Sequence, residues 1–267
     1  MRITNNFQPK IPERVIKLTY SDGRTSFIFR KYYQTENLAA RKINKSPPIK
    51  TNEPMTKSAY IRTLNRYFEK LIELDLNEEN CLFLTLTISD AKHNSYKAIS
   101  TRFKAFPNKV RFSKKFSESY VGAIRFIEVQ RKGFFHIHCV LVFNRQLIKI
   151  PWKTLWRMWG WGYIKVKQVN YLIGLFDYLT NAKHGVDDLS KFTLYPKRSK
   201  IIYISPNIPK CKSENIEMSI EKCALLFKDD RYIGQAKVHK YFDNVNQCVK
   251  TSIDKMVLVQ IKTRRQL

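Results

Sequence analysis

The stretch EVQRKGFFHIHCVLVF, residues 128–143, decides the fold. Residues 135–143 are almost all apolar and rich in β-branched side chains, which is typical of a buried strand. Residues 120–130 form a second predicted strand, and only a short turn around Gly133 separates the two. Because a turn this short joins antiparallel neighbours, the stretch predicts a β-hairpin whose second strand is buried on at least one face.

Two histidines share one face of this predicted hairpin. His136 and His138 are separated by Ile137, and residues two apart in a strand point to the same side of a sheet. Two imidazoles placed in this way can chelate one divalent ion. The alternative is a chance arrangement with one core histidine and one surface histidine.

The position of Glu128 bears on both interpretations. If the hairpin loop has an odd number of residues, such as 131–133, Glu128 faces His136, whereas an even number would turn it away. Two imidazole nitrogens and one carboxylate suit Mg²⁺ or Mn²⁺ with open coordination positions. Gln130 is two residues after Glu128 in the same predicted strand, so its side chain would point to the same face, where it could support the site or replace a ligand. The alternative is a surface glutamate paired with a neighbouring basic side chain.

The chain of 267 residues is strongly basic. Its 49 Lys and Arg against 22 Asp and Glu give a formal net charge of +27. Residues 91–170 alone carry +15, and Glu128 is the one acidic residue between Glu118 and Asp177. This charge favours an acidic partner, first nucleic acid and second an anionic membrane. A hydrophobic fraction of 43% and an aromatic fraction of 13% exclude a disordered basic tail.

Targeting and redox signals are few. The sequence has no run of eighteen apolar residues and no apolar core of a signal peptide at its N-terminus, so no membrane span is predicted. Five widely spaced cysteines without a C-x-x-C pair indicate reduced thiols in a cytoplasmic protein rather than a zinc site or a disulfide framework. The motif G-x-x-x-x-G-K-[ST] does not occur, so no built-in helicase is indicated.

Strands and helices alternate on both sides of the hairpin. Further strands are predicted at residues 81–89, 163–169 and 201–205, and helices at 57–74, 151–160 and 170–183. Residues 94–115 are predicted to form a basic helix followed by a loop that contains Pro107. Strands with helices between them fit an α+β fold with an antiparallel sheet. Outside this region, strands are predicted near residues 25–29 and 256–261 and a helix at 214–227.

The helix predicted at residues 170–183, NYLIGLFDYLTNAK, carries two tyrosines. Tyr171 and Tyr178 are seven residues apart and face the same side. A tyrosine beside a metal could attack a phosphodiester and form a covalent phosphotyrosine, and Lys183 could supply a nearby cation. Either tyrosine could instead pack as part of an amphipathic helix, and for Tyr171 this interpretation is favoured.

Three segments in this order resemble the motifs of the HUH endonucleases, the rolling-circle replication initiators of plasmids and viruses. They are FLTLT at 83–87, EVQRKGFFHIH at 128–138 and DYLTNAK at 177–183. The resemblance implies a central five-stranded antiparallel sheet flanked by helices, with the histidines on a central strand. It also implies a metal-dependent enzyme that nicks single-stranded or hairpin origin DNA, forms a 5′-phosphotyrosine and a free 3′-OH, and later rejoins strands.

The same resemblance assigns roles to individual residues. It implies that Glu128, His136 and His138 bind Mn²⁺ or Mg²⁺ and that Tyr178 is the nucleophile. Lys183 is a looser match, because the family often has a lysine three residues after the tyrosine, where Asn181 stands here. The implied partners are origin DNA and a host or separately encoded helicase and polymerase. A single-strand transposase of the same chemistry and a non-catalytic nucleic-acid-binding protein remain as alternatives.

The remaining predictions concern domains and DNA contacts. We interpret residues 1–56 as a basic N-terminal arm or extension, 57–210 as the nuclease domain and 211–267 as a C-terminal extension that packs on or follows the nuclease domain. Six basic side chains are candidate DNA contacts: Lys104, Arg111, Lys114, Lys115, Arg131 and Lys132. The basic segment 92–115 is interleaved with aromatic residues and suits a groove that follows a nucleic-acid backbone, but it could equally be a solvated helix with its aromatics packed inward. The four tryptophans are expected in the core, although one could stack on unpaired DNA: Trp152, Trp156, Trp159 and Trp161.

Overall fold

The computed structural model of the protein describes eight stretches of the chain, and they form two compact units. The described residues are 14–30, 54–89, 95–129, 133–147, 150–180, 194–228, 232–243 and 248–260. The larger unit is Ser46–Pro209, and the other combines Met1–Lys45 with Lys210–Leu267. The larger unit covers nearly the same residues as the domain expected at 57–210.

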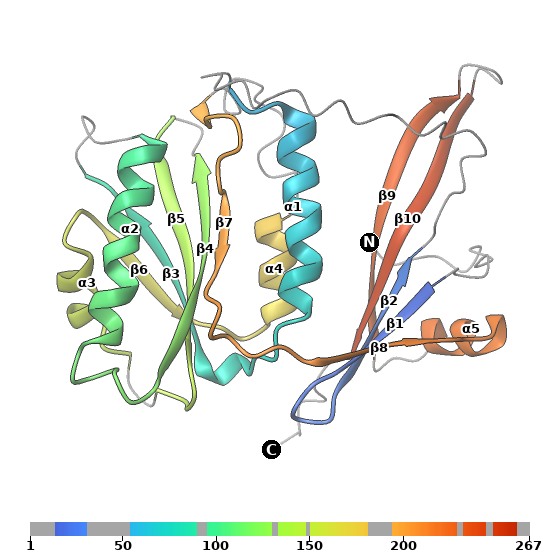
Figure 1. Ribbon diagram of the computed structural model, residues 1–267, viewed down its shortest axis with the longest axis horizontal. Coiled ribbons are helices and arrows are strands. Elements are labelled where there is room, and N and C mark those ends of the chain that lie inside the picture. Colours follow the sequence, from blue (N-terminus) through green and yellow to red (C-terminus); the bar gives the residue numbers. More distant parts are fainter. Residues whose placement is uncertain are drawn as a thin grey trace. The chain divides into compact units, whose positions relative to one another are not determined.

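The larger unit is built on a five-stranded antiparallel sheet with the strand order β6-β3-β5-β4-β7 (Figure 1). Its strands are β3 (Cys81–Thr87), β4 (Tyr120–Val129), β5 (Phe135–Phe143), β6 (Ile164–Gln168) and β7 (Ile202–Ile204). The strand that carries both histidines, β5, is the central one. The predicted α+β fold with a central five-stranded antiparallel sheet is therefore confirmed.

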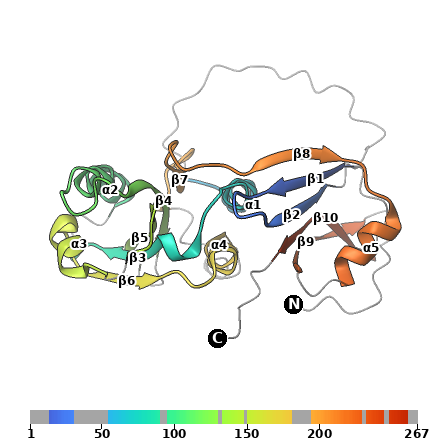
Figure 2. The same ribbon diagram turned by 90° about the horizontal axis from the view of Figure 1, so that it is seen from below.

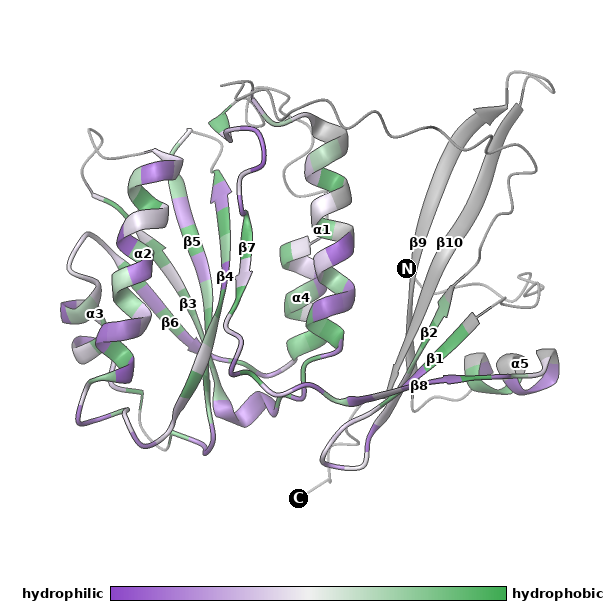
Figure 3. Ribbon diagram, viewed as in Figure 1, coloured by the Kyte–Doolittle hydropathy of each residue, from purple (hydrophilic) through white to green (hydrophobic). Residues whose placement is uncertain are grey.

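Within the described residues, four α-helices flank this sheet, two on each side (Figure 2). They are α1 (Lys57–Ile72), α2 (Tyr96–Arg111), α3 (Trp152–Trp159) and α4 (Leu172–Thr180), and a 3-10 turn, η1 (Glu78–Asn80), precedes β3. Helices α2 and α3 cover one face, whereas α1 and α4 lie on the other. Hydrophobic and hydrophilic residues alternate along α1 and α2 (Figure 3), as expected for helices with one face on a sheet.

Hydrophobic side chains are fully buried on the face under α2 and α3. Alternate residues of β3 and β5 point to it, and these are fully buried: Leu82, Leu84, Leu86, Ile137, Cys139 and Leu141. Phe103 and Phe106 of α2 pack onto them as buried residues. The helix continues through Pro107 to Arg111, rather than ending before the proline as expected. Burial of Phe106 and Val110 on either side outweighs the backbone hydrogen bond that a proline removes.

The second unit contains another five-stranded sheet, with the order β8-β1-β2-β10-β9 and antiparallel neighbours throughout. Its elements are β1 (Arg14–Thr19), β2 (Thr25–Arg30), β8 (Lys212–Ile216), α5 (Ile220–Lys228), β9 (Tyr232–Asp243) and β10 (Cys248–Gln260). Leu18 and Ile28 are fully buried in it. The described part of the chain contains no helix long and apolar enough to cross a membrane.

This second sheet differs from the expectation of a separate N-terminal arm and C-terminal extension. Strands β1 and β2 pair with β8 and β10, because a two-stranded hairpin cannot bury its own apolar side chains. The helix expected at 214–227 is also shorter: α5 begins at Ile220, and residues 212–216 form β8. The polar segment KSENI has no strong strand pattern of its own, and its conformation comes from pairing with β1.

Candidate metal and nucleic-acid site

The β4–β5 hairpin brings the three predicted ligands to one face of the sheet. Glu128 pairs with His136 across the hairpin, and Phe126 pairs with His138. Gly133 in the connection has a φ of +80°, which a residue with a side chain rarely adopts. The register is the one that an odd loop produces, so the expected convergence of Glu128 with both histidines is present.

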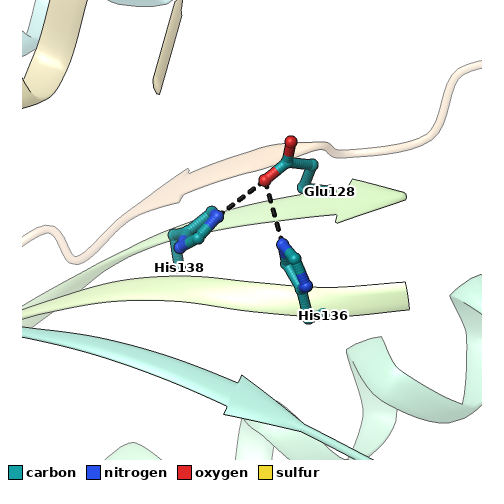
Figure 4. Close-up of side chains that lie close together, drawn as sticks. All are labelled: Glu128, His136 and His138. Carbon is teal, nitrogen blue, oxygen red and sulfur yellow. Dashed lines mark hydrogen bonds and ion pairs between the residues drawn. The ribbon is translucent and has the colours of Figure 1, made fainter. Parts of the chain in front are cut away.

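Both histidines contact the same carboxylate oxygen. Nε2 of His136 lies 2.9 Å from Oε2 of Glu128, and Nε2 of His138 lies 2.6 Å from it (Figure 4). Both imidazoles are buried, whereas Glu128 is partly exposed. One ligand atom from each residue lies within 4.8 Å of the others, so this group could hold a metal ion. Two imidazole nitrogens and a carboxylate oxygen are a donor set that suits a divalent cation.

The electrostatics of the cluster keep the carboxylate ionised. Burial alone would raise the pKa of Glu128, but the hydrogen bonds from His136 and His138, together with their charges, hold that pKa well below its ordinary value. Among the described residues, the buried Nδ1 of His136 has no hydrogen-bond partner. The site therefore presents a carboxylate anion between two imidazoles, which fits a positively charged ligand.

Two residues of β3 support His138. Oγ1 of Thr85 lies 3.3 Å from Nδ1 of His138, and the ring of Phe83 stacks on the imidazole with centroids 5.4 Å apart. Thr85 pairs with His138 across the strands, which explains the contact. The sequence offered one signal for this role, because Phe83 and Thr85 are two apart in the segment FLTLT and share a face.

Tyr195 holds the backbone of β4 beside Glu128. Its buried hydroxyl donates a hydrogen bond of 3.1 Å to the carbonyl of Ile127, just beyond the residues that pair with β7. The ring of Tyr60 lies 5.6 Å from the Tyr195 ring, and burial together with the charge of Glu128 raises the pKa of Tyr60 to about 12. Sequence reasoning missed Tyr195, because it lies outside every predicted element and motif.

Tyr171 stands just before the first residue of α4. The backbone N–H of Leu172 donates to Oε1 of Glu78 at 3.2 Å, which ties this end of α4 to the end of β3 that is remote from the histidines. The Tyr171 ring lies directly against Gly174. Burial, and then the negative charges of Glu78 and Asp177, raise the pKa of Tyr171, so its hydroxyl is a poor source of a phenolate.

Tyr178 lies in the last turns of α4 and is 50% exposed. Seven helical residues advance about 10 Å along the axis, so Tyr178 is about that far from Tyr171. In Figure 1, α4 begins at the level of η1 and runs in the direction of β4, toward the end of the sheet that carries Glu128. The start of α4 is thus at the end of the sheet remote from the histidines, and Tyr178 lies near the other end of the helix.

The candidate DNA contacts fall into two groups. Lys104, Arg111, Lys114 and Lys115 are exposed on α2 and the turn that follows it. The other two, Arg131 and Lys132, lie outside the described residues, and so do Gln130 and Lys183, which were predicted near the metal and the tyrosine. Phe103 and Phe106 are buried whereas Phe112 is 77% exposed, so α2 packs most of its aromatics inward and leaves its lysines in solvent. The contacts themselves remain predictions.

Comparison with known proteins identifies one family. Residues 81–183 match the sequence model of a family described as Replication-associated protein ORF2. The match runs from β3 to just beyond α4 and includes the Glu128, His136 and His138 group as well as Tyr178. No curated protein and no solved structure gives a significant match. The match and the geometry of the group confirm, over this part of the chain, the resemblance to rolling-circle replication proteins.

Proposed function

We propose that this protein is a replication initiator that nicks single-stranded or hairpin origin DNA and later rejoins the strands. The observation that carries the proposal is the convergence of Glu128, His136 and His138 within 4.8 Å inside the segment that matches a replication-associated family. A net charge of +27 is consistent with a DNA partner. The nuclease domain proposed at 57–210 corresponds to the unit Ser46–Pro209.

In this proposal, Glu128, His136 and His138 hold a divalent metal ion, Mn²⁺ or Mg²⁺. When bound, the ion supplies positive charge that polarises the scissile phosphodiester. The buried imidazoles and the anionic carboxylate would supply the protein ligands of the ion. Phe83 and Thr85 keep the His138 ring oriented, and Tyr195 fixes the backbone next to Glu128. These contacts hold the group in one geometry, which an ordered site requires.

Tyr178 is the proposed nucleophile. Its hydroxyl oxygen attacks the phosphorus, the phenolic proton is released, and the bond from phosphorus to the 3′ oxygen breaks. The 3′ oxygen takes up a proton and becomes the free 3′-OH, while the 5′-phosphate stays on the tyrosine. Rejoining is the reverse transfer. Tyr178 is favoured over Tyr171 because it is half exposed, whereas Tyr171 packs on Gly174 with a raised pKa.

The proposed setting is the host cytoplasm, with a helicase and a polymerase that the chain does not itself provide. The 267-residue sequence contains no Walker-type phosphate loop, and a host or separately encoded helicase is proposed to separate the strands. Lys183 is proposed to assist Tyr178. Six basic residues are proposed to contact DNA: Lys104, Arg111, Lys114, Lys115, Arg131 and Lys132.

Covalent capture tests the proposal. The full chain is incubated with Mn²⁺ and single-stranded oligonucleotides that tile the DNA around its own coding sequence, and adducts are resolved on a denaturing gel. We expect an adduct with the unaltered chain and with Tyr171→Phe, and none with Tyr178→Phe or His136→Ala. An adduct on Tyr178→Phe would refute the nucleophile. Salt-sensitive DNA binding without cleavage by any oligonucleotide would instead indicate a non-catalytic binding protein.

A further inference from the structure

The loop between α3 and β6 is pinned to the end of β3. The N–H of Thr87 donates to the carbonyl of Tyr163, and the N–H of Ser89 donates to that of Trp161, both at 3.0 Å. The N–H of Tyr163 returns a 3.0 Å hydrogen bond to the hydroxyl of Thr87. The hydroxyl of Ser89 adds a further bond to the carbonyl of Trp161, 3.2 Å long. Trp161 and Tyr163 are therefore held on a fixed backbone.

Gly162 makes this close approach possible. A Cβ at this position would lie 2.6 Å from the carbonyl oxygen of Thr87 and 2.8 Å from the nitrogen of Ser89, which is closer than any side chain allows. The indole N–H of the buried Trp159 donates to the same Thr87 oxygen at 2.7 Å and anchors the loop from the core. A loop this well anchored loses little conformational entropy when its side chains bind a partner.

The loop presents two large aromatic residues to solvent. Tyr163 is 69% exposed and Trp161 is 45% exposed. The guanidinium of Arg102 lies 3.9 Å from the centre of the Trp161 ring, so the indole is already oriented by a cation–π contact. Exposed aromatic rings that are fixed in position are the stacking platforms on which unpaired bases bind.

Two lysines continue this surface along β6, the edge strand of the described sheet. Lys165 pairs with Thr85 and Lys167 pairs with Phe83, so both lysines are on the face of the sheet that carries His138. Both are exposed, while Ile164 between Tyr163 and Lys165 points to the core. Exposed lysines in a row along an edge strand can bind backbone phosphates.

We propose that Trp161, Tyr163, Lys165 and Lys167 form a binding strip for single-stranded DNA, in which bases stack on the two rings and the lysines contact phosphates. Charge complementarity supports this occupant, because no acidic residue occurs between Glu128 and Asp177. The alternation of aromatic and basic side chains suits unpaired bases, whereas duplex DNA offers its bases only at their edges.

Lys165 and Lys167 of the strip lie beside the metal-binding group on the same sheet face, and Trp161, which contacts Arg102 of α2, lies at the end of the strip that extends toward that helix. β6 is separated from β5 by β3 alone, so the strip is about 10 Å from the histidine strand at ordinary strand spacing. Thr87 pairs with His136, which puts the Tyr163 end of the strip level with the group. This inference rests on the proposed function for its ligand, and the strip would deliver a strand to the site where Tyr178 acts.

Binding in the absence of metal tests the strip independently of cleavage. Fluorescence anisotropy with a labelled mixed-sequence single-stranded oligonucleotide in EDTA measures affinity when no nicking can occur. We expect Trp161→Ala and Tyr163→Ala each to weaken binding about tenfold, as the loss of one stacked base does, and Tyr163→Phe to keep near-normal affinity. The double variant Lys165→Gln, Lys167→Gln is expected to lower the salt dependence of log affinity by about 1.4, which corresponds to two phosphate contacts.

Trp152→Ala and Trp156→Ala are the matched controls. These tryptophans are 54% and 49% exposed, similar to Trp161, but they belong to α3 on the other side of the sheet. Full affinity in the controls together with loss in the strip variants supports the strip. Equal losses of affinity in the strip variants and the controls, or no loss in the strip variants, overturns it. A loss of affinity for duplex DNA as large as that for single-stranded DNA also overturns it. Loss of binding only in the strip variants supports it even if covalent capture fails, so the two proposals can fail separately.

Discussion

Replacing Thr85 with valine is expected to weaken metal binding without disturbing the fold. Valine has nearly the shape of threonine, and it removes only the hydroxyl that lies 3.3 Å from Nδ1 of His138. In the metal-free protein, Nε2 of His138 points at Oε2 of Glu128, and this nitrogen has to carry a proton to donate a hydrogen bond to the carboxylate. A metal requires the lone pair of that same nitrogen, so the remaining proton has to sit on Nδ1.

The hydroxyl of Thr85 can serve both states. It donates to Nδ1 when that nitrogen is bare, and it accepts when the nitrogen carries the proton, because a hydroxyl has one donor and two lone pairs. Loss of a partner that supports a metal-binding histidine costs about 10- to 100-fold in metal affinity. We therefore expect a rise of about 10- to 100-fold in the dissociation constant for Mn²⁺ in Thr85→Val, and little change in Thr85→Ser.

Isothermal titration calorimetry of the metal-free protein with Mn²⁺ at several pH values measures this effect. Affinity should increase with pH in every variant, since protons compete with the metal for its ligand atoms. Thr85→Ser controls for the hydroxyl, and unfolding in urea checks that Thr85→Val remains folded. Equal Mn²⁺ affinity of Thr85→Val and the unaltered chain would refute the assigned role of the hydroxyl.

Three further predictions concern stability, each measured by unfolding in urea. Gly162→Ala should destabilise the larger unit by about 1–3 kcal/mol, because its methyl group overlaps the backbone of β3; a stability equal to that of the unaltered chain would contradict the close approach. Tyr195→Phe should cost about 0.5–1.5 kcal/mol through its lost hydrogen bond to Ile127, whereas the exposed control Lys114→Gln should stay within about 0.5 kcal/mol. Because the folded protein lowers the pKa of Glu128, this residue contributes stability in full above its ordinary value of 4.5, and the contribution is lost as pH falls through the lower folded value. Glu128→Gln should therefore lose less stability than the unaltered chain on acidification below pH 4.5, and identical acid profiles would show that the histidine contacts do not form.

Short-range patterns account for what the sequence predicted correctly. The hairpin of β4 and β5 depends on alternation and loop length, and both can be read from adjacent residues, so the meeting of Glu128 with His136 was predictable. The same holds for α1, where Thr56 accepts a hydrogen bond from the N–H of Ala59 at the helix start. Parity in FLTLT puts Phe83 and Thr85 on one face, but that this is the histidine face follows only from the pairing of Thr85 with His138.

Long-range packing accounts for what the sequence did not predict. Tyr195 reaches Ile127 only because a segment far along the chain returns to the edge of β4. Trp159 is buried as expected, but Trp152 and Trp156 are exposed, because α3 is short and turns only one side to the sheet. Trp161 is also exposed, because it lies in the loop that follows the helix. A hydrophobic residue type alone does not reveal which side of a short helix meets the core.

The second sheet makes the order of synthesis matter for folding. Strand β2 pairs with β10, and Arg30 lies opposite Lys255 in this pair. The pair can form only after the larger unit, Ser46–Pro209, has been translated. At ordinary ribosomal speed this delay is about 10 to 45 s. During that interval β1 and β2 form a lone hairpin with an open hydrogen-bonding edge, which other chains can pair with. The region 46–209 can complete its own sheet meanwhile, so a nascent chain would carry a folded insert before its first strands acquire their partners, and the exposed hairpin is where a chaperone would be needed.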